Sequence, residues 1–204
     1  MDKRTRKSYS KFNERDIEDL GIRIIQENWF QHSFQLPPSD LLTQTFAINL
    51  QLPVFTEKAK SELIITPILN EIWARNTAFF TIYSGYNFEV DKSKGLNGFC
   101  DYILARTPQS VFINTPVLAV VEAKNEQDLP NATPQCVAEM YAAYLFNEQR
   151  HKSIPIIYGI ITSGFEWMFL KLENKVAILD TKRYFLNQLP ELLGALQTII
   201  DRCR

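Results

Sequence analysis

The stretch from Pro116 to Lys124, PVLAVVEAK, constrains the fold of this chain more than any other. Its aliphatic residues run without a polar residue until Glu122, a pattern typical of a strand buried on both faces of a sheet. Because side chains alternate along a strand, Glu122 and Lys124 are expected on the same face, where both charges need partners. Upstream, Asp101 lies in the half-apolar segment GFCDYILA. This segment is expected to pair as the neighbouring strand, so that three charged groups converge.

An acid on one strand followed by Glu-x-Lys on the next resembles the PD-(D/E)XK nuclease superfamily. Asp101, Glu122 and Lys124 are the matching positions, and the surrounding segments LNGFCDYIL, VEAKN, PQCVAEMYAA and IYGIITSGFEWMFLKL match as well. The resemblance covers residues 57–172 and looks like that to a small, single-domain, cyanobacterial-type member. It implies an α/β restriction endonuclease-like core, with a mixed central sheet of about five strands flanked by helices.

The resemblance also implies a site for Mg²⁺, with Mn²⁺ as a substitute, held by Asp101, Glu122 and the backbone carbonyl of Ala123. Metal ions of this kind activate water and offset negative charge during phosphodiester hydrolysis. Lys124 is expected to position the hydroxide and to steady the transition state, and whether it is also the general base stays open. Gln135, early in the following helix, is expected near the site to orient a phosphate or a water.

Nucleases of this superfamily often carry a third acid on their first core helix. The segment TEKAKSELIITPILNEIWAR is predicted to be mostly helical, as one kinked helix or as two pieces around its Thr-Pro pair. Glu62 and Glu71 lie on opposite faces of a continuous helix, so only one is expected to reach the metal. Glu62 is favoured as the metal ligand and Glu71 is the second candidate. For either residue, a solvent-exposed helix acid without a role in the site is an equally common interpretation.

The order of the elements predicts one α/β domain over residues 1–204, with an N-terminal helical extension over 1–55 and a core over 56–204. Apolar residues recurring every three or four positions indicate an amphipathic helix from Phe12 to Phe30, and Ser39-Asp40 can cap a second helix. Three strands, in FFTIYSGYNFEV, GFCDYILA and PVLAVVEAK, are predicted to form an antiparallel meander.

The second half of the core is predicted to begin with the helix PQCVAEMYAAYLFNEQR, laid across the sheet, and to continue into a parallel strand, IPIIYGIIT. Gln135 and Glu139 share one face of this helix. RecB-type nucleases carry a tyrosine where this chain has Glu139, a departure from that pattern. A hairpin through Glu173-Asn174 and an amphipathic C-terminal helix interrupted by Pro190 are predicted to complete the fold.

The composition of the chain argues against several other classes of function. The net charge of -1 counts against a strongly basic nucleic-acid binder, and the basic segment over residues 1–11 is more often a frayed terminus than a DNA contact. The three cysteines fit no zinc motif and are interpreted as reduced thiols, mostly in the core. Without an apolar leader or a membrane-spanning run, a cytoplasmic protein is expected. His32 and His151 are the only histidines, so a two-histidine metalloprotease lacks parts.

These observations favour a divalent-metal-dependent nuclease with DNA as its partner, and leave a choice between DNA and RNA and between endo- and exonuclease action open. A catalytically inactive nuclease-fold module for binding or assembly is the alternative. Carboxylates of Asp101 and Glu122 that point into one open cleft would favour the enzyme, and a splayed pair would favour the inactive module. A nuclease that cuts both strands of a DNA duplex needs two active sites. A homodimer formed through the apolar N-terminal helices could supply them.

Overall fold

The computed structural model describes residues 7–31, 34–108 and 110–204. His32 and the first six residues of the basic N-terminal segment therefore lie outside the described residues. The helices are α1 (Glu14–Asp19), α2 (Asp40–Asn49), α3 (Glu57–Lys60), α4 (Thr66–Ala74), α5 (Thr133–Gln149) and α6 (Leu189–Arg202). The strands are β1 (Arg23–Glu27), β2 (Thr81–Asn87), β3 (Phe99–Ala105), β4 (Val117–Ala123), β5 (Ile157–Thr162), β6 (Glu166–Glu173), β7 (Val176–Asp180) and β8 (Tyr184–Phe185).

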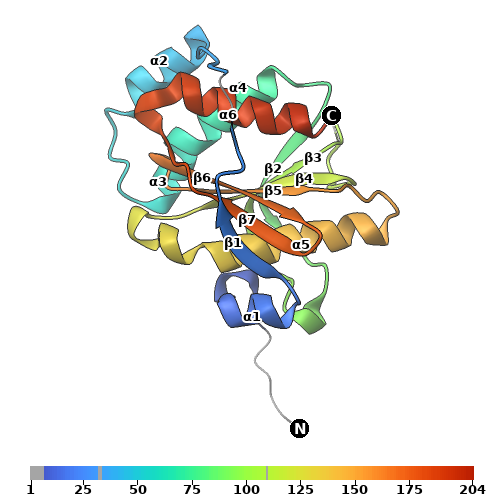
Figure 1. Cartoon of the computed structure of the whole chain (residues 1–204). Helices are drawn as coiled ribbons and strands as arrows, with labels where there is room; N and C mark the ends of the chain where they lie inside the picture. The colour runs from blue at the N-terminus through green and yellow to red at the C-terminus, as the bar shows by residue number, and fades with distance from the viewer. Residues whose placement is uncertain (1–6, 32–33, 109) are drawn as a thin grey trace.

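The strands of the described chain form one eight-stranded mixed sheet in the order β1-β7-β6-β5-β4-β3-β2, with β8 paired to β6. The pairs β4/β5 and β1/β7 are parallel, and the other neighbours are antiparallel. In Figure 1, α1 and α5 lie on one side of the sheet, and α2, α4 and α6 lie on the other. The fold is therefore α/β, with an open sheet between helices as predicted, and the sheet is larger than the five strands expected.

The N-terminal segment differs from the long helix predicted from Phe12 to Phe30. Helix α1 ends at Asp19, and Gly21 follows with a left-handed φ of 73°. Glycine in this conformation commonly ends helices because it carries no Cβ. The chain then enters β1, which pairs in parallel with β7 at the edge of the sheet. The predicted helical extension is thus wrong in this part, because β1 belongs to the central sheet.

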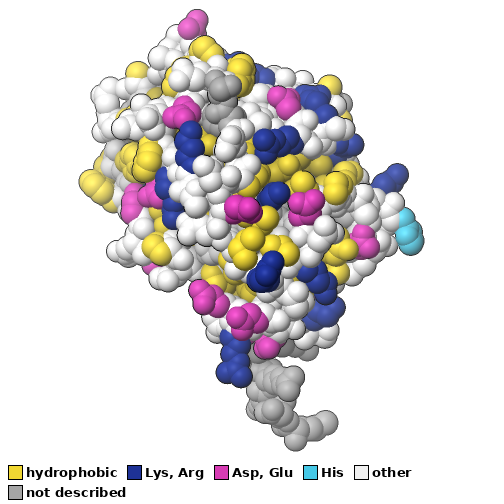
Figure 2. Space-filling model, viewed as in Figure 1, with side chains coloured by type: hydrophobic (Ala, Val, Ile, Leu, Met, Phe, Trp, Pro, Cys, Tyr) yellow, Lys and Arg dark blue, Asp and Glu magenta, His cyan; other side chains and the backbone are white. Residues whose placement is uncertain are grey.

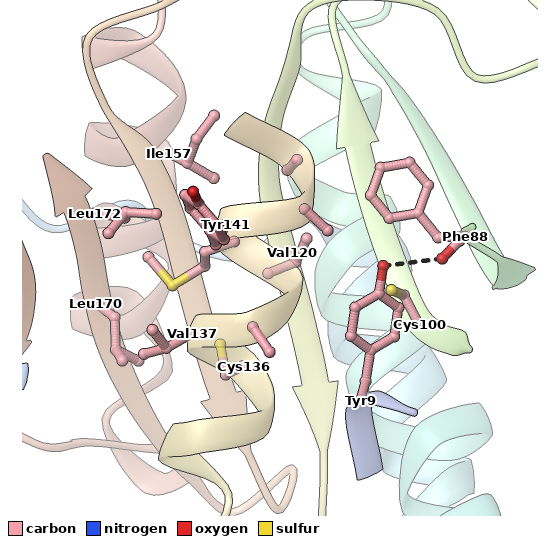
Figure 3. Close-up of a cluster of buried hydrophobic side chains, with 14 of the residues drawn as sticks. Tyr9, Phe88, Cys100, Val120, Cys136, Val137, Tyr141, Ile157, Leu170 and Leu172 are labelled. Carbon is pink, nitrogen blue, oxygen red and sulfur yellow. Dashed lines mark hydrogen bonds between the residues drawn. The ribbon is translucent and has the colours of Figure 1, made fainter. Parts of the chain in front are cut away.

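Side chains before β1 are also part of the core. Tyr9 is 1% exposed, and its hydroxyl donates a hydrogen bond to the carbonyl of Phe88 over 2.9 Å (Figure 3). Its backbone amide donates to the carbonyl of Asn97 over 3.1 Å. Ile17 and Ile22 are buried in the same apolar cluster. The N-terminal segment therefore holds the connection between β2 and β3 in place.

Strand β4 is buried along its whole length, as its aliphatic run predicted. Helix α5 crosses β4 and β5 on one face, with Cys136 and Val137 among the buried side chains shown in Figure 3. Its approach to β5 depends on Gly159, where an added Cβ would lie 2.4 Å from the Sδ atom of Met140 and 2.9 Å from the Sγ atom of Cys136. Cys136 is a free buried thiol, in agreement with the prediction of core cysteines.

The segment predicted to be mostly helical is so without a break: α3 runs into α4 through a π-helical turn at Ser61–Ile65, just before the Thr-Pro pair. Pro67 lacks the N–H that the carbonyl of Leu63 would bind in a regular α-helix. The Nδ2 atom of Asn49, at the end of α2, donates to that carbonyl over 2.8 Å instead. A π turn also changes which side chains share a face on either side of it.

Most of the remaining predicted elements are present. The β2–β3–β4 meander, the parallel crossover through α5 to β5 and the β6–β7 hairpin all form. The hairpin turns at Asn174 and Lys175, one residue later than the predicted Glu173-Asn174, and both turn residues have positive φ. Pro190 lies in the first turn of α6, where a missing N–H is tolerated, so it begins this helix and does not interrupt it. Within the described residues, no helix combines the length and hydrophobicity needed to cross a membrane.

Candidate functional site

Three charged residues lie together at one end of the sheet. Asp101 is the third residue of β3, Glu122 is the last but one of β4, and Lys124 comes just after β4. Because β3 and β4 are antiparallel, the start of one lies beside the end of the other. The Oδ2 atom of Asp101 accepts the backbone N–H of Ala123 over 2.8 Å, and the ammonium of Lys124 forms an ion pair with Glu122. Strand pairing thus brings two carboxylates and one ammonium together.

The backbone of Lys124 is fixed by the sheet. Its N–H donates to the carbonyl of Thr162 over 2.8 Å, which extends the parallel pairing of β4 and β5 by one residue. Burial lowers the pKa of the Lys124 ammonium, but the carboxylates of Glu122, Glu57 and Asp101 outweigh burial and hold this pKa above its ordinary value. Lys124 therefore stays a cation at neutral pH, which disfavours its use as a general base.

Glu122 is the most deeply buried of the three, with 2% of the residue exposed. Its Oε1 atom accepts from the Nε2 atom of Gln135 over 2.7 Å as well as from Lys124. Its buried Oε2 atom has no nitrogen or hydroxyl partner among the described residues, and the neighbouring carboxyl of Glu139 donates a hydrogen bond to Glu122 when it is protonated. Burial, followed by the nearby charge of Asp101, raises the pKa of Glu122 to about 7. A buried carboxylate oxygen without a partner is uncommon, and a bound ion or water is one explanation for it.

Helix α5 provides the polar wall behind Glu122. Gln135 is its third residue, and the Nε2 atom also donates to the Oε1 atom of Glu139 over 3.1 Å. Glu139 is completely buried, and burial together with the charge of Glu122 raises its pKa well above the ordinary value. This favours a neutral Glu139 beside an ionisable Glu122. The amide of Gln135 therefore bridges two acids and restrains the orientation of Glu122.

Glu57, the first residue of α3, is a further acid near enough to Lys124 and Asp101 to interact with their charges. Burial raises its pKa, the charge of Lys124 lowers it, and the charge of Asp101 raises it again, with a net shift upward. The hydroxyl of Thr56 caps the helix by accepting the N–H of Ala59 over 3.1 Å, so Glu57 is held in the first helical turn. Sequence reasoning missed Glu57, although the Thr56 cap was a signal that the helix begins there.

Lys60 holds α3 against the chain that follows β4. Its ammonium is almost completely buried and forms an ion pair with Glu126, and it lies 3.5 Å from the Oδ1 atom of Asn125. Asn125 and Glu126 come directly after Lys124. The α3 helix and the Lys124 segment are therefore tied together beside the three charged residues.

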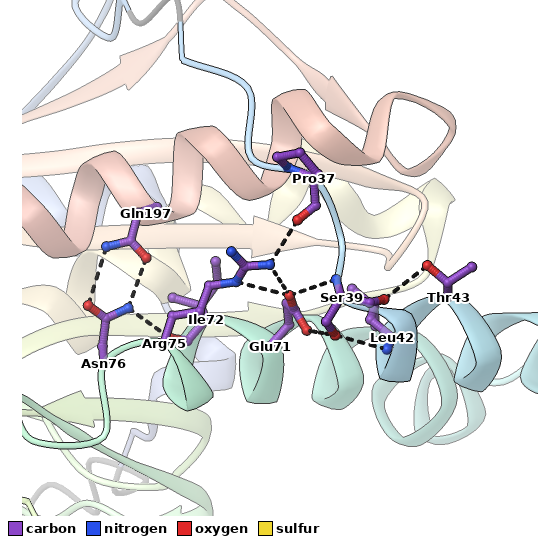
Figure 4. Close-up of polar contacts among 9 residues, drawn as sticks. All are labelled: Pro37, Ser39, Leu42, Thr43, Glu71, Ile72, Arg75, Asn76 and Gln197. Atoms are coloured by element: carbon purple, nitrogen blue, oxygen red, sulfur yellow. Dashed lines mark hydrogen bonds and ion pairs between the residues drawn. The ribbon is translucent and has the colours of Figure 1, made fainter.

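The two acids that the sequence suggested as the helix ligand lie elsewhere. The side chain of Glu62 is 60% exposed and pairs with Lys58 at 2.9 Å. Glu71 accepts hydrogen bonds from the N–H and the hydroxyl of Ser39, over 3.0 and 2.6 Å, and pairs with Arg75 (Figure 4). These contacts join the start of α2 to α4. The structure brings neither Glu62 nor Glu71 into the group around Glu122.

The donor set around Glu122 suits a hard divalent cation. Asp101, Glu122 and the carbonyl of Ala123 offer oxygen ligands, which Mg²⁺ prefers, and Glu57 adds a nearby negative charge. A cation would also offset the negative charge of Glu122, whose Oε2 atom has no nitrogen or hydroxyl partner among the described residues. Within the part of the chain that is described, no three His, Cys, Asp or Glu side chains form a preassembled metal cluster.

In comparisons with protein-family models, curated proteins and solved structures, nothing matches this chain. The functional argument therefore depends on the residues and geometry described above.

Proposed function

We propose that this chain is a divalent-metal-dependent nuclease that hydrolyses phosphodiester bonds in DNA, built on a restriction endonuclease-like core. The observation that carries the proposal is the convergence of Asp101, Glu122 and Lys124 where β3 begins and β4 ends. The parallel return of β5 beside β4, after the α5 crossover, agrees with the same core. The PD-(D/E)XK resemblance supplies the type of reaction.

Asp101, Glu122 and the carbonyl of Ala123 would hold Mg²⁺, or Mn²⁺ in its place, and Glu57 would be the acid contributed by the first core helix. When bound, the ion supplies Lewis acidity and lowers the pKa of a coordinated water. Gln135 restrains Glu122 through its hydrogen bond, and a restrained ligand favours one metal geometry over others.

Lys124 contributes as a fixed positive charge. Because the surrounding carboxylates keep it protonated, its ammonium can bind a phosphate oxygen and stabilise the negative charge that grows there in the transition state. It can also donate a hydrogen bond to the attacking hydroxide. It does not remove a proton from water in this proposal.

The charge of the site makes DNA binding depend on metal. Glu57, Asp101 and Glu122 together repel a phosphate unless a cation offsets their charge. The rest of the surface offers little compensation, since the chain has a net charge of -1 and acidic and basic side chains are interspersed on the face shown in Figure 2. Binding of DNA at this site is therefore expected to weaken in chelator.

A catalytically inactive nuclease-fold module for binding or assembly is the second candidate. The ion pair between Lys124 and Glu122 favours it, because that contact neutralises the carboxylate without a metal. Calorimetric titration of the folded chain with Mn²⁺ separates the two. Binding that is lost in Asp101→Asn supports the enzyme, and the absence of any binding supports the inactive module.

The prediction of a homodimer stays a prediction. Helix α2 exposes Leu41 and Ile48, which are 75% and 66% exposed, and these are the apolar side chains that such an interface would use.

The proposed activity is tested by incubating plasmid and linear DNA with the protein in Mg²⁺, in Mn²⁺ and in chelator. We expect cleavage only with metal, and a rate at least about 100-fold lower in Lys124→Ala. Lys152→Ala, which changes an exposed lysine just after α5, is the matched control and should cleave normally. Circular dichroism and thermal melting verify that each variant is folded. Unchanged cleavage in both Lys124→Ala and Asp101→Asn would overturn the proposal and assign the activity to a contaminant.

A further inference from the structure

Four exposed phenylalanines lie on segments that begin or turn at the end of the sheet carrying the charged residues. Phe55 is 85% exposed, Phe99 70%, Phe185 41% and Phe165 37%. Single exposed apolar side chains are common on protein surfaces, but a group of them beside polar residues indicates a contact surface. Phenylalanine offers no polar atom, so a partner of this surface must itself present a flat or apolar face.

Two of these rings flank the carboxylates along the chain. Phe55 stands two residues before Glu57, just outside the capped start of α3. Phe99 stands two residues before Asp101, at the start of β3. Both rings are therefore attached to the elements that carry acids of the candidate site.

The other two rings lie across the sheet from Phe99. Phe165 is in the turn that follows Thr162, the residue whose carbonyl accepts the N–H of Lys124. Phe185 is in β8 and pairs with Glu166 at the start of β6. From β3 through β4, β5 and β6 to β8 there are four strand intervals, or about 19 Å. The phenylalanines thus lie on both sides of Lys124, spread over the width of several nucleotides.

We propose that the DNA bound at this site is single-stranded, and that its unpaired bases stack on these phenylalanine rings. This inference rests on the proposed nuclease function and names its substrate class. In a duplex the bases are stacked on one another, so exposed aromatic rings gain few contacts with them. An unpaired base presents its face, and base–aromatic stacking is the usual way in which proteins hold single strands without sequence preference.

The lysine and arginine side chains at this end of the sheet also favour a single-stranded substrate. Binding of duplex DNA depends mainly on lysines and arginines that contact phosphates. Lys58, Lys60 and Arg183 each form an ion pair with an acid of this protein, namely Glu62, Glu126 and Glu166. Their charge is therefore largely offset already, and stacking must carry a larger share of the affinity. We expect single-strand binding to depend only weakly on salt.

The test measures fluorescence anisotropy of a labelled oligonucleotide, either single-stranded or annealed to its complement, with Ca²⁺ in place of Mg²⁺. Electrophoresis of the probe verifies that it stays intact. Phe99→Ala and Phe55→Ala are each expected to weaken single-strand binding about fivefold or more, and Phe99→Trp is expected to retain it. The matched control is Phe112→Ala: Phe112 is 73% exposed, but it lies in the connection between β3 and β4, at the opposite end of these strands.

Tighter binding of the single strand, lost in Phe99→Ala and kept in Phe112→Ala, supports the inference. Equal binding of single strand and duplex, unaffected by the phenylalanine substitutions, overturns it and leaves the proposed nuclease function standing. An equal loss in Phe112→Ala also overturns it, because stacking would then not be specific to this end of the sheet. If neither probe binds, the proposed nuclease function fails and this inference fails with it.

Discussion

Glu57 and Glu62 are five residues apart on one helical segment, yet their surroundings are opposite. Glu57 interacts with the charges of Lys124 and Asp101, whereas Glu62 points to solvent and pairs with Lys58. We expect Glu57→Gln to weaken Mn²⁺ binding and to slow cleavage, each by about tenfold or more, while Glu62→Gln changes neither. Calorimetry gives the affinity and single-turnover cleavage gives the rate. The reverse result, with Glu62→Gln impaired and Glu57→Gln normal, would contradict this assignment.

Glu122 makes the stability of the metal-free protein depend on pH. Its pKa is about 7 in the folded protein against an ordinary value of 4.5, so the folded state binds this proton more tightly than the unfolded state does. Stability is therefore expected to fall as the pH rises from about 4.5 to about 7, by on the order of 3 kcal/mol when the shift is fully expressed. The raised pKa values of Asp101 and Glu139 act in the same direction.

Denaturant unfolding in chelator, at about pH 4 and about pH 8, measures this effect. We expect Glu122→Gln to be more stable than the unaltered protein at the higher pH and nearly equal to it at the lower pH. Comparing the two proteins at each pH cancels the contribution of other titrating groups. Glu62→Gln, at an exposed position, is the control and should follow the unaltered protein. A variant that is less stable at the higher pH would show that the buried charge is well compensated in the fold.

The sequence was sufficient to place Asp101, Glu122 and Lys124 near one another, because the first two belong to strands with an apolar pattern and Lys124 directly follows one of these strands. Alternation along a strand is regular, so the direction of a side chain can be counted from its neighbours. The position of Glu57 near the site and the complete burial of Glu139 could not be predicted in this way. Their positions depend on how a helix packs against the sheet, and this is a tertiary property that helical spacing alone does not specify.

At the scale of single elements, Gly159 sets the distance between α5 and β5. An added Cβ would contact Met140 and Cys136 at distances far below van der Waals contact. We expect Gly159→Ala to lower the free energy of unfolding by about 1–3 kcal/mol, as overpacking of a core usually does. Denaturant unfolding measures the loss, and Met140→Ala in the same protein should recover part of it, because the two substitutions share one contact. A fully additive pair would contradict this account.

Two elements show where sequence patterns fail for physical reasons. The stretch from Ile17 to Trp29 keeps a helical spacing of apolar residues, but Gly21 ends α1 and the remainder becomes β1. Ile24 and Ile25 suit a strand as well as a helix, and only pairing with β7 decides between them. In the helix after Thr56, the π turn changes the phase that the comparison of Glu62 with Glu71 assumed to be constant.

At the scale of the whole molecule, the N-terminal segment is part of the folding unit. Ile17 is fully buried against the α5 side of the core, whereas Ile48 of α2 is 66% exposed. We expect Ile17→Ala to cost about 2–5 kcal/mol in the free energy of unfolding, and Ile48→Ala to change it by less than about 0.5 kcal/mol. Chemical denaturation of both variants measures the difference. Equal small effects would show that α1 is a separable attachment to the domain.

The class of the whole fold could be predicted, because buried β-branched runs alternate with a long helix in the second half of the chain. The size of the sheet could not. β1 lay in a segment with a helical pattern, and β8 is a pair of residues, Tyr184 and Phe185, with no pattern of its own. Strands at a sheet's margin carry weak signals because fewer of their side chains are buried, as the mostly exposed β1 shows.

The parallel pairing of β1 with β7 has a consequence for synthesis on the ribosome. The 152 residues between Arg23 and its partner Val176 must be made before these two strands can pair. Strand β1 must therefore stay unpaired in the nascent chain until β7 has been made, with its apolar side chains uncovered. A chain released before β7 is made would leave β1 without a partner strand. Quality control in the cell should recognise such a fragment readily.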